Sequence, residues 1–291
     1  MAKSFYNALR KFNHQLESWQ AMGKVRVLVF WGYGINCEVE TAYAFKLCGA
    51  TPEIVHLSEV FSGEVKIPDY HILAFPGGFL DGDHLGAAQA CAHRFKTLRI
   101  KAEYPLWDDL MKFLDQGGLI IGICNGFQLL VKMGLLPGGE YLGKRVATLT
   151  YNDSGRFEDR WVHLKVEKHT PCIFLKGLEE LYLPVRHGEG KFLTESDEIL
   201  KKLEAKGQLA LRYIHPETKE PTLEYPYNPN GSPLGIAGLC DETGRVFGLM
   251  PHPEAFNHFT NHPRWTALKT KTAQGLLIFQ NAVDWSRSNL L

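Results

Sequence analysis

The chain has 291 residues, 45% of them hydrophobic, so it can bury a sizeable core as one large domain or two small ones. Lysine plus arginine and aspartate plus glutamate both total 32, and this balance argues against the basic surface that nucleic-acid binding requires. No apolar run reaches the ~18 residues of a transmembrane helix and the N-terminus lacks an apolar signal region, so we expect a cytoplasmic protein with a small polar ligand or a protein partner and no membrane partner.

Residues 1–24 are expected to form an N-terminal arm with helical character. Large apolar side chains recur in it at helical spacing, namely Phe5, Leu9, Phe12, Leu16 and Trp19. This stripe fits packing on the protein's own body or on a partner. No repeat, low-complexity tract or clean linker follows, so we expect residues 25–291 to form a single domain.

The sequence pattern in the N-terminal half of this domain predicts alternating strands and helices. Residues 25–31 are a nearly continuous apolar run, and residues 38–48 follow with apolar side chains at helical spacing. Further strands are expected at 53–57, 71–78 and 119–124, and further helices at 105–118 and 125–134. Strands that alternate with helices are typical of a parallel sheet covered on both faces.

From about residue 145 the pattern changes to strands joined by turn-rich loops, which predicts antiparallel pairs. The expected strands lie at 160–169, 181–192, 209–214 and 244–250, and one long helix is expected over 265–287. The predicted fold is therefore α/β, with an open, mostly parallel, flavodoxin-like sheet flanked by helices and an antiparallel portion in the C-terminal half.

Cys124 lies in the segment GICNG, at the junction of a predicted strand and a predicted helix. A glycine on either side permits the strained turn of a nucleophile elbow, with cysteine in place of serine. The helix N-terminus would also favour the thiolate, which is the reactive form. The alternative is that Cys124 packs as a small hydrophobe between strand and helix.

A general base for this thiol is predicted in the segment MPHPE. Pro253 disfavours helical geometry at His252, and on an extended path residues 252 and 254 face the same side, with Cα atoms ~7 Å apart. Glu254 could then orient His252 while His252 takes the proton of Cys124. The alternative is a purely structural turn, since the chain contains 12 histidines.

Acyl transfer to a thiolate also needs donors for the developing oxyanion. Gly77 and Gly78 follow a short strand and let backbone amides approach a ligand, and the amide of Asn125 would be the second donor. The alternative for the two glycines is an ordinary turn.

Other features carry weaker signals. The cysteines outside the elbow, Cys37, Cys48, Cys91, Cys172 and Cys240, form no Cys-x-x-Cys pair and are interpreted as packing residues. His258 and His262 are four residues apart, but no carboxylate or cysteine pattern accompanies them, so no metal site is predicted. WGYGINC lacks the third glycine of a dinucleotide loop. His187 and Glu189 fit either a base and acid pair or loop residues at a substrate or partner surface.

Three segments resemble, in the same order, those of the triad (class I) glutamine amidotransferases: PGGFLDGDHLGA (76–87), GICNGFQ (122–128) and MPHPE (250–254). Four further segments resemble the members of this family that serve purine biosynthesis: INCEVETAYAF (35–45), NDSGRFEDRW (152–161), RHGEGKF (186–192) and EYPYNPNGSPLGIAGL (224–239). The resemblance extends from about residue 25 to residue 256.

This resemblance implies that Cys124, His252 and Glu254 hydrolyse L-glutamine through a glutamyl thioester and deliver the ammonia to a synthase. It implies that Gly78 and Asn125 donate to the oxyanion and that Gln128 helps to hold the glutamine. It also implies no cofactor on this chain, because ATP and magnesium would belong to a separate large synthase subunit, with or without a small bridging subunit.

Three other segments are longer than this resemblance implies, and they are expected at a partner interface: the arm, residues 88–106 and residues 215–221. The alternatives for function are another amidotransferase, a free-standing glutamyl hydrolase, and a catalytically silent protein that keeps the fold.

Overall fold

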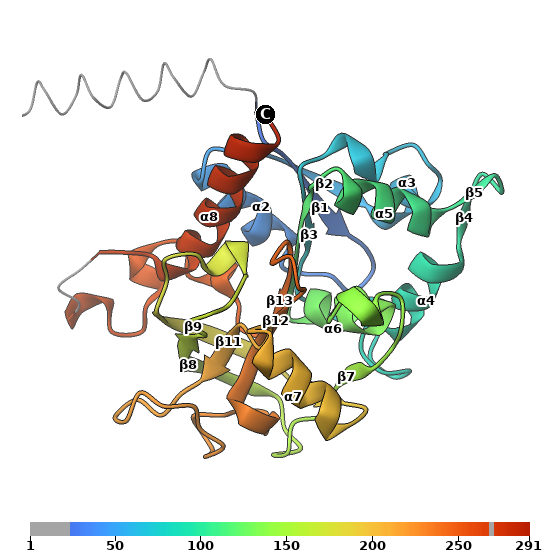
Figure 1. The fold of residues 1–291 in the computed structure, drawn as a ribbon. Helices are drawn as coiled ribbons and strands as arrows, with labels where there is room; N and C mark the ends of the chain where they lie inside the picture. The colour runs from blue at the N-terminus through green and yellow to red at the C-terminus, as the bar shows by residue number, and fades with distance from the viewer. Residues whose placement is uncertain (1–23, 268–270) are drawn as a thin grey trace, which may run out of the picture.

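A nine-stranded sheet runs through the molecule, whose structure is a computed structural model that describes residues 24–267 and 271–291. The strand order is β2-β1-β3-β6-β13-β12-β11-β8-β9 (Figure 1). The prediction of an open sheet flanked by helices is confirmed. The predicted arm, apart from Lys24, lies outside the described residues.

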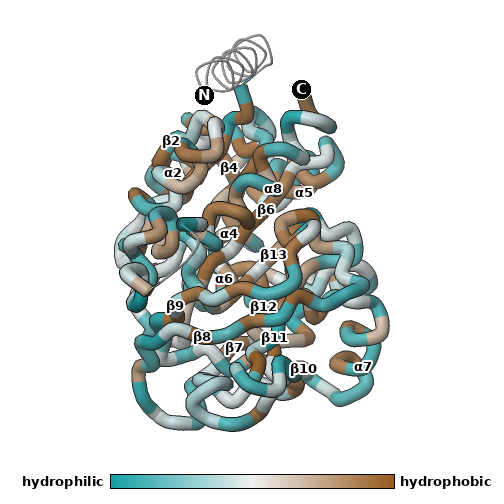
Figure 2. Tube along the Cα trace, turned by 90° about the vertical axis from the view of Figure 1, so that its left-hand side faces the viewer, coloured by the Kyte–Doolittle hydropathy of each residue, from teal (hydrophilic) through white to brown (hydrophobic). Residues whose placement is uncertain are grey.

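One half of the sheet is parallel, as predicted. It consists of β1 (Arg26–Trp31), β2 (Thr51–His56), β3 (Ile72–Phe75), β6 (Leu119–Ile123) and β13 (Val246–Leu249). All neighbours among these strands run parallel. Every residue of β3, β6 and β13 is buried, which explains why these segments are continuous apolar runs rather than alternating patterns (Figure 2).

The other half is antiparallel, as predicted, but the strand predicted at 244–250 among the antiparallel pairs is β13 of the parallel half, and the strand at 236–240 was not predicted. The antiparallel half consists of β12 (Ile236–Cys240), β11 (Leu211–Tyr213), β8 (Glu158–Val166) and β9 (Glu180–His187). β13 joins the two halves, because it runs parallel to β6 and antiparallel to β12. Two small antiparallel pairs lie outside this sheet: β7 (Ala147–Thr150) with β10 (Lys191–Thr194), and β4 (Arg99–Ile100) with β5 (Tyr104–Pro105).

Helices cover both faces of the parallel half (Figure 1). They are α2 (Glu38–Leu47), α3 (Leu57–Phe61), α4 (Gln89–Thr97), α5 (Leu106–Asp115), α6 (Asn125–Met133) and α8 (Gln274–Asn289), whereas α7 (Asp197–Ala205) lies next to β10. Short 3₁₀ turns are η1 (Ile67–Asp69), η2 (Gly139–Tyr141), η3 (Ile173–Leu175), η4 (Pro233–Gly235), η5 (Pro253–Ala255), η6 (Phe259–Asn261) and η7 (Trp265–Ala267). α2 packs against α8, whereas α4 packs against α5 and α6.

Of the apolar stripe that predicted α2, Ala42 is buried but the three larger side chains are not. Val39, Tyr43 and Leu47 are 61%, 50% and 46% exposed. The buried face carries Phe45 instead, whose ring lies edge-on to Phe279 of α8 at 4.9 Å. The helix was therefore predicted correctly, but its orientation is set by the contact with α8, which is distant in sequence.

The strand predicted over 181–192 is wrong as a single element. β9 ends at His187 and β10 begins at Lys191, and the two belong to different sheets. Gly190 allows the close contact at this break, because a Cβ on it would lie 2.5 Å from the His187 ring. The intervening loop turns toward the carboxyl edge of the parallel strands.

The helix predicted over 265–287 is also wrong in its first part. Trp265–Ala267 is a 3₁₀ turn, residues 271–273 are not helical, and α8 begins at Gln274. At this start Gly275 packs directly on the chain after β13, where a Cβ would lie 1.9 Å from the carbonyl oxygen of Pro253. Docking onto another segment, rather than helical periodicity, therefore determines where α8 begins.

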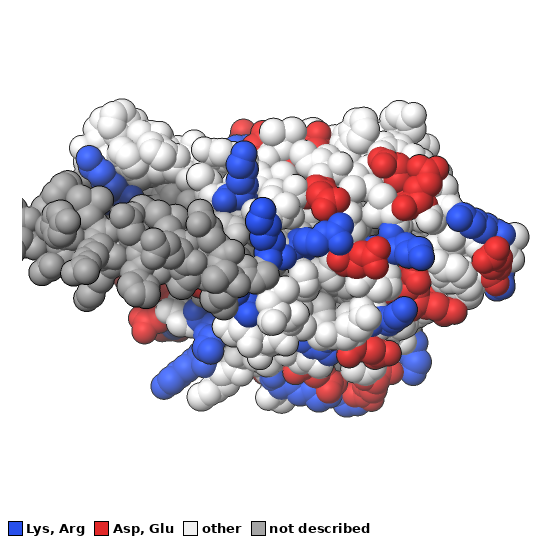
Figure 3. All heavy atoms as spheres, turned by 90° about the horizontal axis from the view of Figure 1, so that it is seen from above, with Lys and Arg blue, Asp and Glu red and all other residues white. Residues whose placement is uncertain are grey.

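The described part of the chain, residues 24–267 and 271–291, contains no helix with both the length and the apolarity of a membrane span. On the described part of the face in Figure 3, acidic and basic side chains alternate without a broad patch of one sign. This distribution agrees with the equal totals of acidic and basic residues in the sequence.

Candidate active site

Cys124 occupies a strained turn between β6 and α6. Its φ and ψ are 51° and −103°, which lie outside the regions that residues with a side chain normally adopt. Its amide donates to the carbonyl of Leu249 on β13 at 2.8 Å, and its carbonyl accepts from Gln128 in the first turn of α6 at 3.1 Å. The surrounding sheet and helix thus hold the backbone in this conformation and place the thiol at the carboxyl edge of the parallel strands.

The two glycines around Cys124 allow a close approach between α6 and the neighbouring strands. A Cβ on Gly126 would lie 1.9 Å from the carbonyl oxygen of Phe75 on β3. A Cβ on Gly122 would lie 2.6 Å from the carbonyl oxygen of Gly126. Both obstacles are backbone atoms, which cannot rotate away, so the GICNG pattern is a packing requirement of the turn.

We expect Gly126→Ala to lower the free energy of unfolding by about 3 kcal/mol, since α6 must move away from β3. Urea unfolding followed by circular dichroism measures this loss. Gly188→Ala is the matched control, because a Cβ there meets nothing closer than 4.0 Å at Phe157. Equal stability of the two variants would contradict the proposed role of the close contact.

His252 and Glu254 form a buried pair. His252 Nδ1 lies 2.6 Å from Glu254 Oε1, and the two side chains are 3% and 1% exposed. Burial lowers the pKa of His252, but the Glu254 carboxylate and the Cys124 sulfur outweigh burial, and the net pKa lies well above its ordinary value. The imidazolium form is therefore favoured when it faces a thiolate and a carboxylate.

The path between these two residues differs from the predicted one. His252 is non-helical, with φ −105° and ψ 87°, but the chain then enters the 3₁₀ turn η5 instead of continuing extended. The amide of Ala255 donates to the His252 carbonyl at 3.3 Å and closes this turn. The side chains of residues 252 and 254 meet through the turn and not through the alternation of a strand.

The thiol of Cys124 opens into a pocket of about 210 Å³. Its Sγ donates weakly to the carbonyl of Arg186 at 3.5 Å, and it interacts electrostatically with His252, which also lines the pocket. The remaining walls are formed by Asn36, Cys37, Glu40, Gly78, Phe79, Asp83, Gln128, Phe157 and residues 186–189. Phe157 belongs to the segment NDSGRFEDRW, so this segment borders the pocket.

The two predicted oxyanion glycines take different positions. Gly78 lines the pocket with φ 147°, and a Cβ on it would lie 2.5 Å from the carbonyl oxygen of Gly34. A Cβ on Gly77 would lie 2.7 Å from Cε1 of His252. Gly77 therefore makes room for the histidine ring, whereas Gly78 faces the space in front of Cys124.

Asn125 and Gln128 form a buried chain of side-chain hydrogen bonds beneath the pocket. Asn125 Oδ1 accepts from the Leu80 amide at 3.2 Å, and Asn125 Nδ2 donates to Gln128 Oε1 at 2.9 Å. Gln128 Nε2 donates to the carbonyl of Glu189 at 2.6 Å. Gln128 thus ties α6 to the 188–190 loop, and its direct contact with glutamine stays a prediction.

Cys37 is the residue of this site that sequence reasoning missed. Its Sγ lies 4.0 Å from His252 Nδ1 and lines the pocket, and burial raises the pKa of its thiol. The sequence carried a usable signal, because Cys37 follows β1, and the carboxyl ends of parallel strands meet at one edge. It was interpreted as a packing residue because it lacks flanking glycines at a strand-to-helix turn.

His187 does not have the properties of a second general base. Burial and the nearby His252 lower the pKa of His187 to about 3, so the ring is neutral. Its Nδ1 lies 3.0 Å from Asn152 Oδ1. Glu189 Oε2 accepts from the amide of Ala87 at 3.3 Å. These contacts favour the loop interpretation of the segment RHGEG.

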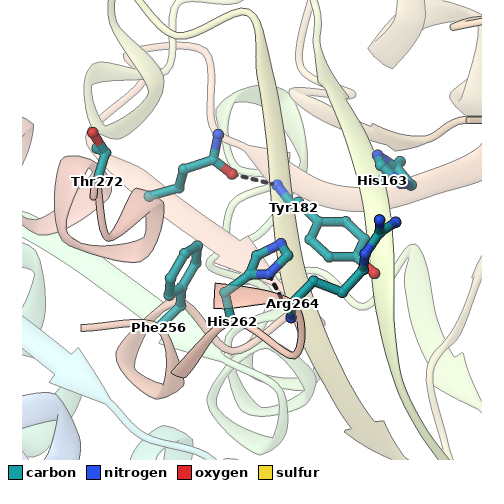
Figure 4. Close-up of a pocket in the computed structure, with 7 residues that line it drawn as sticks. His163, Tyr182, Phe256, His262, Arg264 and Thr272 are labelled. Carbon is teal, nitrogen blue, oxygen red and sulfur yellow. Dashed lines mark hydrogen bonds between the residues drawn. The ribbon is translucent and has the colours of Figure 1, made fainter. Parts of the chain in front are cut away.

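A second pocket, of about 300 Å³, lies next to the end of η5, where Phe256 lines it (Figure 4). It is lined by His163, Tyr182, Phe256, His262, Arg264, Thr272 and Gln274. In Figure 4 the His262 ring lies between Phe256 and Tyr182, and ring contacts of 5.9 and 5.2 Å join them. His262 therefore packs among aromatic rings and is not gathered with His252 into a metal-ligand group.

A thiol on a strained strand-to-helix turn, beside a buried histidine–glutamate pair, is the arrangement of a cysteine-dependent acyl-transfer enzyme on an open α/β sheet. Residues 24–286 match the family model of the CobB/CobQ-like glutamine amidotransferase domain. The chain belongs to this family and is a glutamine amidotransferase.

The names of known proteins that are similar to this chain specify one particular enzyme within the family. It is 46% identical to phosphoribosylformylglycinamidine synthase subunit PurQ of Dehalococcoides mccartyi, over 91% of this chain and 99% of that protein. It is 38% identical to the protein of the same description from Archaeoglobus fulgidus, over 90% and 97%. The structure of PurLQS from Thermotoga maritima contains a chain with a TM-score of 0.65 and 30% identity, matched over 90% of this chain and 99% of that one.

Proposed function

We propose that the chain is the glutaminase subunit of phosphoribosylformylglycinamidine synthase. The observation that carries the chemistry is the 2.6 Å contact between His252 and Glu254 beside the thiol of Cys124. The extent of the similarity to PurQ proteins supports the choice of synthase. Within this proposal residues 25–291 act as one domain, and six free cysteines support a cytoplasmic location.

The proposed reaction begins with the Cys124 thiolate and the His252 imidazolium. The sulfur attacks the side-chain amide carbon of glutamine, and His252 gives its proton to the leaving nitrogen, so that ammonia departs and a glutamyl thioester remains. His252, now neutral, takes a proton from water, which attacks the thioester and releases glutamate. Glu254 holds the ring through Nδ1 and stabilises its charged form in both steps.

The oxyanion of each tetrahedral intermediate needs donors next to Cys124. In this proposal the amide of Gly78 and the amide of Asn125 supply them, and Gly77 leaves space for His252. Gly78 lines the pocket and Asn125 follows the elbow, which supports both assignments. Gln128 holds the pocket floor against Glu189, so that the bound glutamine meets a fixed surface.

The ammonia is consumed by a synthase subunit. The similarity to a chain in the PurLQS structure supports such a partner. In the proposed complex the large subunit binds ATP and magnesium and converts formylglycinamide ribonucleotide into the amidine, and a small bridging subunit completes the assembly. The present chain needs no cofactor for the glutaminase half-reaction.

We expect the synthase subunit to stimulate glutamine hydrolysis at least about tenfold when its nucleotide substrate and ATP are present, a difference of ~1.4 kcal/mol in the barrier. The measurement is glutamate release, with the formation of amidine followed in the same samples. Omission of ATP is the control. An equal rate of glutamate release with and without the synthase subunit would assign the chain to another amidotransferase or to a free hydrolase. No hydrolysis in either sample would favour a silent scaffold.

A further inference from the structure

Cys37, His252 and Glu254 bring three different metal-ligating groups together. One ligand atom from each lies within 4.8 Å of the other two, and within residues 24–267 and 271–291 this is the one such group of three. Cys37 Sγ and His252 Nδ1 are 4.0 Å apart, and His252 Nδ1 and Glu254 Oε1 are 2.6 Å apart. The thiol comes from the start of α2, 215 residues before the histidine.

The space between the thiol and the imidazole exists because residue 77 is glycine. A Cβ on Gly77 would lie 3.3 Å from Cys37 Sγ and 3.4 Å from His252 Nδ1. The buried Glu254 Oε2 also has no hydrogen-bond partner, so the carboxylate keeps an acceptor available. Cys37 is partly exposed and lines the Cys124 pocket, which gives an ion a path from solvent.

The ligand chemistry selects the class of ion. Sulfur, imidazole nitrogen and carboxylate oxygen together suit Zn²⁺, whose ligands lie at about 2.3, 2.0 and 2.1 Å. Mg²⁺ and Ca²⁺ require six or more oxygen ligands, which this group lacks. Tetrahedral coordination places ligand atoms about 3.5 Å apart. Side-chain rotations that move each of the three atoms by about 0.5 to 1 Å therefore bring them into place.

We propose that Zn²⁺, or another divalent ion of the same preference, binds Cys37, His252 and Glu254 and inhibits the enzyme. Cys37 loses its thiol proton and His252 loses the proton on Nδ1, both to solvent, and the ion forms one bond to the sulfur and one bond to Nδ1. The remaining imidazole proton then resides on Nε2, so the ring cannot accept the proton of Cys124. No oxidation or reduction is involved. The inhibition rests on the proposed glutaminase function, whereas the binding does not.

Cobalt chloride is the first probe, because a thiolate bound to Co²⁺ gives a near-ultraviolet charge-transfer band. We expect the band in the full chain and in Cys124→Ser, and we expect its loss in Cys37→Ser. His258→Ala, which removes an exposed histidine outside the group, should keep the band. Loss of the band in Cys124→Ser, its survival in Cys37→Ser, or its absence from the parent chain would each overturn the assignment.

Zinc affinity, measured by competition with a chromophoric chelator, gives a second readout that does not depend on thiolate absorption. Cys37→Ser and Glu254→Gln should each weaken zinc binding by at least about tenfold, the lower end of the loss seen when a partner of a metal ligand is removed. Each variant tests the site by itself, so if one of them misfolds, the other still tests the proposal. Unchanged affinity in whichever variants keep the parental melting temperature would overturn it.

Glutamate release separates this inference from the proposed function. Zinc chloride should inhibit the parent chain, and a chelator should restore the rate. An active chain that binds no zinc would refute the metal site and leave the glutaminase function standing. A chain that binds zinc through Cys37 but never hydrolyses glutamine would support the metal site and refute the proposed function.

Discussion

Replacing Cys124 with alanine is expected to lower kcat for glutamine hydrolysis by on the order of 10⁴-fold or more, because no other group can form the thioester. Cys37 cannot take over, since it lies on the Nδ1 side of His252, 4.0 Å from that atom. Glutamate release measures the loss. The same variant, combined with the synthase subunit, should still form amidine from added ammonia.

The control for this variant is Cys91→Ala. Cys91 is a fully buried thiol of α4, and burial raises its pKa to about 12, so it carries no thiolate at neutral pH. Its replacement should cost stability and leave glutamine turnover near the parental rate. Parental turnover in the Cys124→Ala variant would refute the assignment of the nucleophile.

The second large effect is expected for Glu254→Gln, which keeps the shape of the side chain and removes its charge. We expect kcat/KM to fall by on the order of 10³- to 10⁴-fold, as for the loss of the acid that orients a triad histidine. The Glu254 carboxylate raises the pKa of His252, so without it the imidazolium loses its proton at a lower pH. The thiolate–imidazolium pair is then depleted at neutral pH.

The pH profile of kcat/KM tests the sign of this effect. In the parent enzyme, activity should persist until the pH rises through the raised pKa of His252, and in Glu254→Gln this alkaline limb should move to lower pH. Glu40→Gln is the matched control, since it removes a carboxylate from the rim of the same pocket. An alkaline limb that stays in place in Glu254→Gln would show that Glu254 does not set the proton affinity of His252.

The parallel half of the sheet and the elbow could be predicted because their determinants are local. Strands buried on both faces require unbroken apolar runs, as in residues 119–123, and these runs are visible without any knowledge of the neighbours. Likewise, the pattern of a cysteine between two glycines at a strand-to-helix junction predicts the backbone conformation of the turn. Cys124 has the strained φ of 51° that such a turn needs.

The features that were mispredicted depend on contacts between distant segments. α8 begins at Gln274 because Gly275 packs on the carbonyl of Pro253, and α2 turns Phe45 inward because α8 supplies Phe279. Helical periodicity reports which positions are apolar, but it does not report which neighbour is present to cover them.

The sequence by itself determined the class of fold, the strained position of Cys124 and the pairing of His252 with Glu254, since each depends on residues within a few positions of one another. Only the tertiary structure decided that Cys37 joins this pair, because the two segments are 215 residues apart and meet where the parallel strands end. Side chains at that edge are brought together by strand order, and strand order is a property of the whole sheet rather than of any single segment.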